Sequence, residues 1–394
     1  MVEEIKSSLN RMLDKFNASI MLNANVFDIS FTPSEIVERP ETKVLYESLL
    51  SFIVYGVPNH VLLNGPPGTG KTVTAHMLKR ILSERKIRVD YINCENKKPE
   101  NILELLLYPL EPNTGEDMLG VYIKSIPDKT LIILDEIDKS PQSHTLLYQL
   151  SRISELFPDI KKKINLILIS NHPLWDTFLD PYIRSSLTLM KINFLPYKKD
   201  DLYKILKNRV EKGLNPKSIT DDQVKRIAEE VCIQDVGDTR IAMKTLLRAA
   251  ISAEKVGKNI IENSDIESAL RDSRREIQLK RLVGLTNNNF FLLYAAGTGV
   301  SSMGELVREY KEVVYSLCDG KIIPLKSTAI YQGIEYLRSQ GLLDRNIEIK
   351  KEENKPPRKI MLLKSKIATD ILEEELDKRM PSIEHLHLKN KVKE

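Results

Sequence analysis

Cysteine is scarce in this chain. Only Cys94, Cys232 and Cys318 occur among 394 residues, and no two of them have the CxxC spacing of a zinc or redox site. A disulfide framework has an even set of cysteines at regular spacings, so the sequence indicates neither bridges nor zinc. We expect three buried thiols in a protein of a reducing compartment.

Long apolar runs are also missing. No stretch approaches the roughly 18 apolar residues of a membrane span, and residues 1–16 carry charges where a signal peptide has its apolar region. These absences predict a soluble intracellular protein with no membrane partner.

Neither sign of charge is in large excess. The net charge is only +4, although 29% of the residues are charged. If nucleic acid is a partner, the basic contacts must therefore be concentrated locally rather than spread over the surface. With 42% hydrophobic residues, a chain of this length can bury a sizeable core, which we expect to be divided between two or three domains.

Two periodicities alternate through the first half of the chain. Short apolar strand-like runs begin near residues 59, 87, 129 and 164, and helix-like repeats separate them. This alternation predicts an α/β domain with a parallel sheet covered by helices on both faces. An amphipathic helix is expected ahead of it, over residues 1–22.

The pattern changes twice after residue 197. The strand signal stops, and four amphipathic helices are expected at 199–212, 220–232, 238–256 and 263–280. The remainder is mixed, with a β-hairpin and with helices expected at 288–297, 304–318, 326–340 and 366–379. We therefore predict three domains, over residues 1–197, 198–281 and 282–394.

A glycine-rich bend joins the first strand to a long helix. In LLNGPPGTGKTVTAHML, residues 62–78, two glycines, a lysine and a threonine satisfy the pattern GxxxxGK[ST]. Glycine lets backbone N–H groups approach phosphate oxygens, the lysine reaches the outer phosphates, and the threonine hydroxyl binds Mg²⁺. An ordinary Gly/Pro turn is the alternative, which the position between strand and helix disfavours. The pattern predicts an ATP or ADP site formed by Gly65, Pro66, Pro67, Gly68, Thr69, Gly70, Lys71, Thr72, Val73, Thr74 and Ala75.

Two carboxylates follow another strand, as nucleotide hydrolysis requires. Asp135 ends the apolar run of LIILDEID and is expected to hold Mg²⁺ directly or through water, while Glu136 polarises the attacking water. Asn171, at the end of INLILISN, can orient the water or the outer phosphate. A capped strand end is the alternative for the carboxylates, and for Asn171 a turn former is equally well supported. We predict Lys71, Asp135, Glu136 and Asn171 as catalytic residues, with Thr72 and Asp135 as metal ligands.

Together these motifs resemble those of the AAA+ ATPases, and further stretches narrow the resemblance to the archaeal replication initiators related to the origin recognition complex and the cell-division-cycle loader. VFDISFTPSEIVERPETKVLYESLL looks like the segment that lies over the adenine in that family. ISNHPLWDTFLDPYIRSSL is similar to its sensor 1 stretch, INFLPYKKDDLYKILKNRV to the start of its lid, and VGDTRIAMKTLLRAA to its GDxR sensor 2 helix. The resemblance runs through nearly the whole chain and implies a P-loop domain, a helical lid and a winged helix, in that order.

Six more residues at the nucleotide follow from the resemblance. They border it, close over it or touch its γ-phosphate: Val26, Phe27 and Arg39, then Tyr197 and Arg209, then the lid arginine Arg240, which is the fifth predicted catalytic residue. Helical spacing puts Arg209 on the apolar face of its helix. A Gly–Asp pair just before Arg240 is a good cap for the helix that carries it. Without the resemblance, both arginines would be interpreted as solvated helix charges.

One departure from the family concerns the neighbouring subunit. Where relatives usually have DPRVKSS, this chain has DPYIRSS. Tyr182 therefore takes the position of an arginine able to reach a neighbour's nucleotide, and Arg184 lies two residues on. Because an arginine finger is worth about 10³ to 10⁵ in rate, the departure speaks against activation of a neighbour by this chain.

The C-terminal part has the pattern of a winged helix. In KSTAIYQGIEYLRSQGLLD, Ile330, Ile334, Tyr336 and Leu337 form the core face of a recognition helix that enters the major groove. A hairpin follows, with seven basic against two acidic residues between 350 and 366. Binding of a protein, or a hairpin that is only solvated, are the alternatives. We predict contacts to DNA phosphates and base edges from Lys326, Ser327, Thr328, Tyr331, Gln332, Lys355, Arg358 and Lys359.

These features lead to the hypothesis of an ATP-controlled initiator that grips origin duplex DNA and hydrolyses ATP slowly, as a switch. The resemblance implies sister initiator subunits and the replicative helicase as partners, and a cytoplasmic, nucleoid-associated location. Two alternatives stay open. One is a DNA-binding regulator with nucleotide as a structural ligand, which Tyr182 favours, and the other is a clamp-loader-like or transposition-type AAA+ subunit that acts on protein.

Overall fold

The computed structural model describes residues 19–108, 117–157, 159, 162–172, 174–297, 301–318, 322–350 and 358–391. They form two compact units, each described here by itself. The sheet unit comprises residues 23–213 and 237–239, and the helical unit comprises residues 19–22, 214–236 and those from 240 on. Within the described part, no helix combines the length and the apolar character that crossing a membrane requires.

A five-stranded parallel sheet of order β2–β3–β4–β1–β5 forms the centre of the sheet unit. The predicted α/β domain with a parallel sheet is thereby confirmed. The fifth strand escaped prediction because only one of its four residues is buried, so it lacks an apolar run. The strands are Val61–Asn64 (β1), Arg88–Asn93 (β2), Lys129–Asp135 (β3), Lys163–Ser170 (β4) and Met190–Asn193 (β5).

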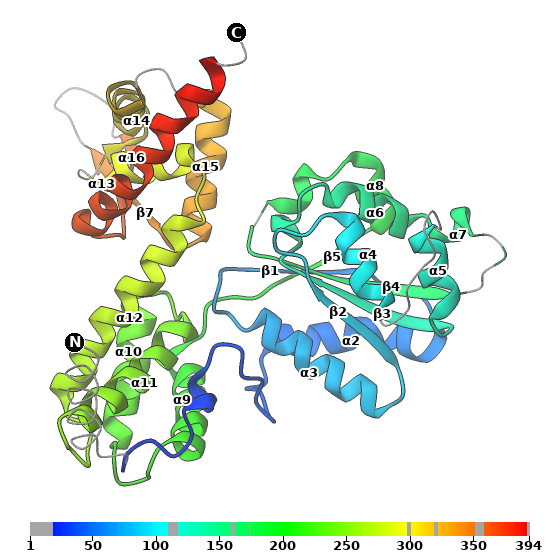
Figure 1. Ribbon diagram of the computed structural model, residues 1–394, viewed down its shortest axis with the longest axis horizontal. Helices are drawn as coiled ribbons and strands as arrows, with labels where there is room; N and C mark the ends of the chain where they lie inside the picture. Colours follow the sequence, from blue (N-terminus) through cyan, green and yellow to red (C-terminus); the bar gives the residue numbers. More distant parts are fainter. Residues whose placement is uncertain are drawn as a thin grey trace, which may run out of the picture. The chain divides into compact units, whose positions relative to one another are not determined.

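Helices cover both faces of this sheet (Figure 1). On one face, α2 (Pro40–Tyr55) and α3 (Lys71–Glu84) share a buried cluster with Leu63 and Ile133. On the other face, Leu134 packs in a second cluster with the remaining helices. Successive strand residues thus serve opposite helix layers, as the two-residue period of a strand requires. The helices of the second layer are α4 (Pro99–Leu107), α5 (Met118–Ser125), α6 (Ser143–Ser151) and α8 (Pro181–Leu187).

Shorter elements complete the sheet unit. Between β3 and β4, the helical stretch is divided at Arg152 into α6 and α7 (Ile153–Leu156). The first of the four helices predicted after residue 198, α9 (Lys199–Gly213), also belongs to this unit. The 3₁₀ turns are η1 (Ala24–Phe27), η2 (Ile137–Lys139) and η3 (Trp175–Phe178).

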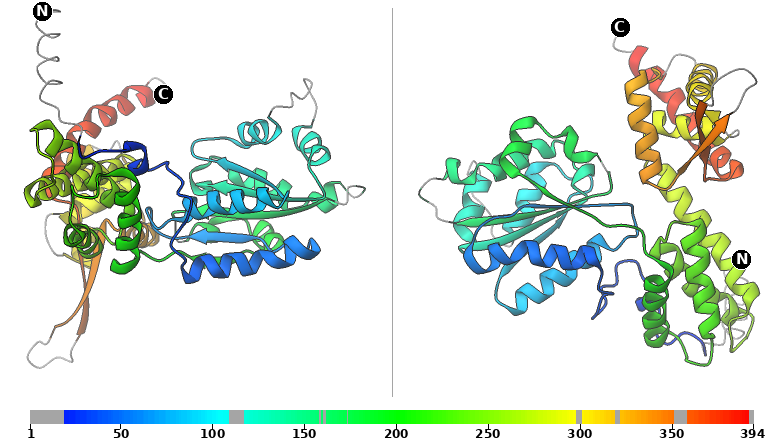
Figure 2. Two further views of the ribbon diagram at one scale, coloured as in Figure 1. Left: turned by 90° about the horizontal axis from the view of Figure 1, so that it is seen from below. Right: turned by 180° about the vertical axis from the view of Figure 1, so that it is seen from behind.

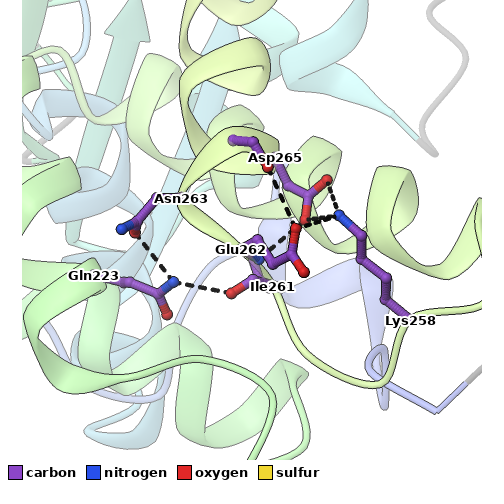
Figure 3. Close-up of polar contacts among 7 residues, drawn as sticks. Gln223, Lys258, Ile261, Glu262, Asn263 and Asp265 are labelled. Atoms are coloured by element: carbon purple, nitrogen blue, oxygen red, sulfur yellow. Dashed lines mark hydrogen bonds and ion pairs between the residues drawn. The ribbon is translucent and has the colours of Figure 1, made fainter.

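The helical unit begins with α10 (Asp221–Gln234), α11 (Thr239–Lys255) and α12 (Asn263–Val283). With α9, these are the four helices that the sequence predicted. The start of α12 is fixed by a reciprocal cap, in which the backbone N–H of Glu262 donates to Asp265 at 2.9 Å (Figure 3). In the same view, Lys258 pairs with Asp265, and the amide of Gln223 from α10 donates to the carbonyl of Ile261.

The described residues before the sheet unit are not helical, although the sequence predicted a helix up to residue 22. Backbone N–H groups of Ile20 and Met21 both donate to Glu254 Oε1 at 2.8 Å, and Met21 forms a bridge with Leu214. These N–H groups cannot serve a helix at the same time, which explains the difference. The rest of the predicted N-terminal helix, residues 1–18, lies outside the described residues.

The C-terminal elements have the order on which the winged-helix prediction rests, two helices followed by a hairpin. In Figure 2 the two hairpin strands, in orange, extend away from the helices. Arg379 of the last helix donates to the carbonyls of Leu282 and Leu285, and so joins these elements to the end of α12. They are α13 (Asn287–Gly297), β6 (Ser301–Ser302), α14 (Met303–Cys318), α15 (Ser327–Ser339), β7 (Leu343–Lys350), β8 (Arg358–Ser365) and α16 (Thr369–Lys391).

One histidine joins three strands of the parallel sheet. His60, just before β1, accepts the N–H of Leu166 in β4 on its Nδ1 at 3.0 Å, and its carbonyl accepts the N–H of Met190 at 2.9 Å. Burial lowers the pKa of His60 to about 4, against 6.5 for an exposed histidine.

We predict that His60 makes the stability of the protein fall with acid. Because the pKa is lower in the folded state, the unfolded chain binds the proton first as the pH falls. The stabilisation is therefore complete above about pH 6.5 and is lost towards pH 4, by up to about 3 kcal/mol. Urea unfolding near pH 7 and near pH 4.5 should show a larger loss for the natural chain than for His60→Gln. Equal losses would contradict this assignment.

Candidate functional site

The carboxyl ends of three neighbouring strands meet at one edge of the sheet. Asn64 at the end of β1 lies beside Ser170 at the end of β4, and β3 flanks β4 on its other side. Since all strands are parallel, the segments that follow them lie along this edge, which is where open α/β sheets bind ligands. These segments are the glycine-rich loop, Asp135–Glu136 and Asn171, so the structure brings the catalytic candidates of the sheet unit to one edge.

Glycine is required in the loop for two reasons, the backbone conformation and the close approach of neighbouring side chains. Gly65, Gly68 and Gly70 have φ values of 148°, 78° and 88°, which other residues rarely adopt. A Cβ on Gly68 would lie 2.0 Å from Oδ1 of Asp238, and a Cβ on Gly70 would lie 2.1 Å from the hydroxyl oxygen of Tyr197. The loop is therefore closely packed from outside, by side chains that hold its shape.

Lys71 directs its ammonium group back into the loop. Its Nζ donates to the carbonyls of Gly65 at 2.6 Å and Pro66 at 2.9 Å, and the residue is 5% exposed. A buried ammonium group needs acceptors, and an anion in the loop would supply stronger ones. The remaining loop candidates lie in the bend or in the first turns of α3: Pro67, Thr69, Val73, Thr74 and Ala75.

Arg39 supports the loop from the side. Its Nη1 donates to the carbonyl of Thr69 at 3.0 Å, and its Nη2 donates to the carbonyl of Leu195 at 2.6 Å. The guanidinium also lies over the ring of Tyr197, 4.3 Å from its centroid, and burial raises the pKa of that tyrosine. Arg39 and Tyr197 thus form one layer against the glycine-rich loop.

Thr72 and Asp135 come together as the metal prediction requires. Thr72 Oγ1 donates to Oδ2 of Asp135 at 2.8 Å, and the carboxylate is almost fully buried. Tyr91, which the sequence did not single out, donates its hydroxyl to the same oxygen at 2.7 Å, and the backbone N–H of Glu136 donates to Oδ1 at 2.9 Å. Hydroxyl and carboxylate oxygens are ligands that Mg²⁺ prefers, so the residues present fit this ion.

Glu136 is held beside this pair in an unusual conformation. Its φ of 54° lies in the left-handed region, which is strained for a residue with a side chain. Its carboxylate accepts a hydrogen bond from Lys139 at 3.0 Å, and Lys139 also donates to Glu95 at 2.8 Å. Burial nevertheless raises the pKa of Glu136. A carboxylate with a raised pKa is suited to polarising water.

Asn171 is tied to the turn that follows Asp135. Its backbone N–H donates to the carboxylate of Asp138, and burial raises the pKa of Asp138. The other oxygen of Asp138, Oδ1, is buried without a hydrogen-bond partner. The contact fixes the end of β4 against η2.

An arginine on α9 has an unmatched donor. Arg209 is 7% exposed, lies over the ring of Phe31 at 4.5 Å, and has a buried Nη1 without a partner. Desolvation lowers the pKa of Arg209. Native structures seldom leave a buried donor unmatched, so this atom requires a partner outside the chain, which a ligand or an ordered water molecule can supply. Val26 and Phe27, which lie a few residues before Phe31 in the chain, are also buried. Phe27 packs on Gly213 at the end of α9.

The remaining candidates belong to the helical unit. Arg240 is the second residue of α11, and Asp238 and Thr239 just before it are part of the sheet unit, where Thr239 donates its hydroxyl to the carbonyl of Gly68 at 3.0 Å. The sequence did not indicate the contact between Thr239 and Gly68, because neither threonine nor aspartate at such a position is specific to a protein with a phosphate-binding loop.

The outward face of α15 carries the predicted DNA contacts. Ile330, Ile334 and Leu337 are buried, as the core face predicts, whereas the helix leaves the opposite side chains exposed. The exposed set is Lys326, Ser327, Thr328, Tyr331 and Gln332. Lys355 lies outside the described residues, as do the side chains of Arg358 and Lys359 in β8.

Two protein-family models match the chain. One, described as an AAA domain, matches residues 56–178, which span β1 to η3. The other, described as the Cdc6 AAA+ ATPase-type lid domain, matches residues 203–271, which reach from α9 into α12. The matches follow the sheet and the four helices in the order observed.

Similar proteins extend this likeness over most of the chain. ORC1-type DNA replication protein 1 of Sulfurisphaera tokodaii is 31% identical over 317 residues, which cover 76% of this chain and 77% of that protein. The solved structure of the Aeropyrum pernix ORC2 protein in its ADPNP-ADP complexes has a TM-score of 0.65 at 22% identity, and covers 92% of this chain and 99% of that chain. The Aeropyrum pernix ORC1 protein in complex with DNA has a TM-score of 0.60 at 23% identity, with 92% and 98% covered.

Gly68→Ala tests whether the shape of the loop matters for a bound nucleotide. The added Cβ meets Asp238 at a positive φ, so the loop must shift, and we expect the affinity for ATP to fall about tenfold or more. Gly304→Ala is the matched control, because a Cβ there has no neighbour within 4 Å. Fluorescent-nucleotide titration measures both. Unchanged affinity in Gly68→Ala would show that the loop does not carry the ligand.

Proposed function

This chain belongs to the family of ORC1-type DNA replication proteins, and from that premise we propose that it is an ATP-binding initiator of DNA replication. It recognises origin duplex DNA through a winged helix, residues 282–394, and its AAA+ domain, residues 1–197, with a helical lid at 198–281 between them. It acts beside sister initiator subunits and helps to recruit or regulate the replicative helicase. ATP hydrolysis is slow and serves as a switch.

The contact between Thr72 and Asp135 carries the nucleotide part of this proposal. Thr72 lies at the start of the helix that follows the glycine-rich loop, and Asp135 lies at the end of a strand. If the loop were only an ordinary Gly/Pro turn, these two side chains would have little reason to meet. Their 2.8 Å hydrogen bond leaves the lone pairs of the Thr72 hydroxyl, together with a position on Oδ1 of Asp135, for a metal ion. The unmatched Nη1 of Arg209 supports a ligand on the α9 side of the same unit.

Each residue of the site has a role in this proposal. Backbone N–H groups from Gly68 to Thr72 surround the phosphates, and Lys71 exchanges the loop carbonyls for the outer phosphate oxygens. Mg²⁺, held by Thr72 and Asp135, would neutralise phosphate charge. Glu136 takes the proton of the attacking water, for which its raised pKa is an advantage. Asn171 and Arg240 orient the γ-phosphate end.

The bordering residues hold the base and ribose side of the nucleotide. Val26 and Phe27 border the adenine with an apolar surface, and Arg39 also borders the nucleotide. Tyr197 and Arg209 close over the ligand. One solved relative is described with ADPNP and ADP and another in complex with DNA, which supports the same two ligands for this chain.

A regulator with nucleotide as a purely structural ligand is the second candidate. Tyr182, at the position where relatives have the arginine that reaches a neighbour, is 78% exposed and so does not serve the packing of this chain. Arg184 is also exposed, in the same short helix. Loss of an arginine finger would slow hydrolysis of the neighbour's nucleotide, which favours a slow switch or no switch at all where the neighbour is a second copy of this chain.

Glu136→Gln separates the two candidates. Because the amide cannot accept the proton, we expect ATP hydrolysis to fall about 100-fold or more while ATP stays bound. If hydrolysis is the switch, the natural protein incubated with ATP should change from the DNA affinity of its ATP form to that of its ADP form. The variant should keep the DNA affinity of the ATP form over the same time. Glu95→Gln is the control, since Glu95 shares Lys139 with Glu136. Identical DNA affinity in both nucleotide forms would leave the structural-ligand candidate standing and refute the switch.

DNA recognition is tested by salt dependence. Lys326→Ala should weaken binding to every duplex and reduce the slope of log affinity against log salt by about 0.9, because one phosphate contact is lost. Gln332→Ala should instead weaken binding to the origin sequence by about 1–3 kcal/mol with an unchanged slope. Fluorescence anisotropy at several salt concentrations distinguishes the two. If neither variant alters DNA affinity, α15 is not the recognition helix.

A further inference from the structure

The carboxylate of Asp135 accepts more hydrogen bonds than the metal prediction needs. Oδ2 accepts two, from the hydroxyls of Thr72 and Tyr91, and Oδ1 accepts one from the backbone N–H of Glu136. Thr72 and Glu136 belong to the motifs that identify the site. Tyr91 does not, because it lies inside β2, at the edge of the sheet.

The position of Tyr91 follows from strand register. Tyr91 lies beside Ile133 of β3, so its side chain shares a face of the sheet with Ile133 and with Asp135 two residues further on. The hydroxyl reaches Asp135 along the diagonal, a distance that only a long side chain spans. The ring of His76, from α3, packs on the tyrosine ring with centroids 4.2 Å apart. Tyr91 is thus held between the sheet and the helix that begins with Lys71.

We propose that Tyr91 is a positioning residue for the metal ligand Asp135. An ionised carboxylate has about four acceptor positions, and the three observed hydrogen bonds use both of those on Oδ2 and one on Oδ1. The carboxylate is therefore fixed in rotation, with one position of Oδ1 left for Mg²⁺ or for water bound to it. Without the tyrosine hydroxyl, a position on Oδ2 is vacated, and Thr72 alone then fixes that oxygen.

This inference rests on the proposed nucleotide function and adds a residue to it. It predicts a specific defect. The glycine cradle and Lys71 bind phosphates without Tyr91, so nucleotide binding in the absence of metal does not depend on the hydroxyl. The Mg²⁺ requirement does depend on it, because Asp135 is the carboxylate that the ion shares with Thr72.

Tyr91→Phe removes only the hydroxyl and keeps the ring against His76. The matched control is Tyr122→Phe, since Tyr122 donates an equally short hydrogen bond, 2.7 Å, to Asp90 in the same unit but away from Asp135. For the natural chain and both variants, binding of a fluorescent ATP analogue is titrated in EDTA and then at increasing Mg²⁺. Thermal unfolding of each protein measures the loss of stability.

For Tyr91→Phe we expect the half-saturating Mg²⁺ concentration to rise about tenfold, with nucleotide affinity in EDTA unchanged. Tyr122→Phe should lower the unfolding temperature without moving the Mg²⁺ dependence. The proposal is overturned if Tyr91→Phe has the Mg²⁺ dependence of the natural chain, or if it loses nucleotide affinity equally with and without metal. Failure of the natural chain itself to bind the nucleotide would refute the proposed function instead.

Discussion

The hydrogen bond between Thr72 and Asp135 is the contact on which the site depends. It joins the first turn of α3 to the end of β3, two elements separated by 63 positions in the chain, across the edge where the strands end. Everything else at that edge is arranged around it. The glycine loop brings Thr72 there, the parallel register brings Asp135, and Tyr91 and the N–H of Glu136 hold the carboxylate from its other sides.

Much of this arrangement could be predicted from the sequence. The strands β1, β3 and β4 are almost entirely buried, so they appear as apolar runs, and the loop between β1 and α3 needs glycine at fixed spacings. The four helices after residue 198 carry strong apolar faces and were predicted within a few residues of their bounds. Features of this kind depend on local spacing, which the sequence displays directly.

Other parts depend on long-range packing and were not predictable in the same way. The short edge strand β5 is mostly exposed, so it lacks the apolar run of a buried strand. Residues 19–22 are not helical because Glu254, more than 230 positions away, accepts the N–H groups of Ile20 and Met21. Tyr91 could be connected to Asp135 only once the register of β2 against β3 was known.

The central claim is that the glycine cradle ahead of Lys71 binds a nucleotide in the folded state. Thermal unfolding of the natural chain with increasing ATP or ADP tests it most directly. A ligand that binds only the folded protein stabilises it by about 2.7 kcal/mol at a concentration of 100 times its Kd, so the account predicts a steady rise in unfolding temperature with either nucleotide. An unfolding temperature that stays constant up to millimolar ATP and ADP would contradict it.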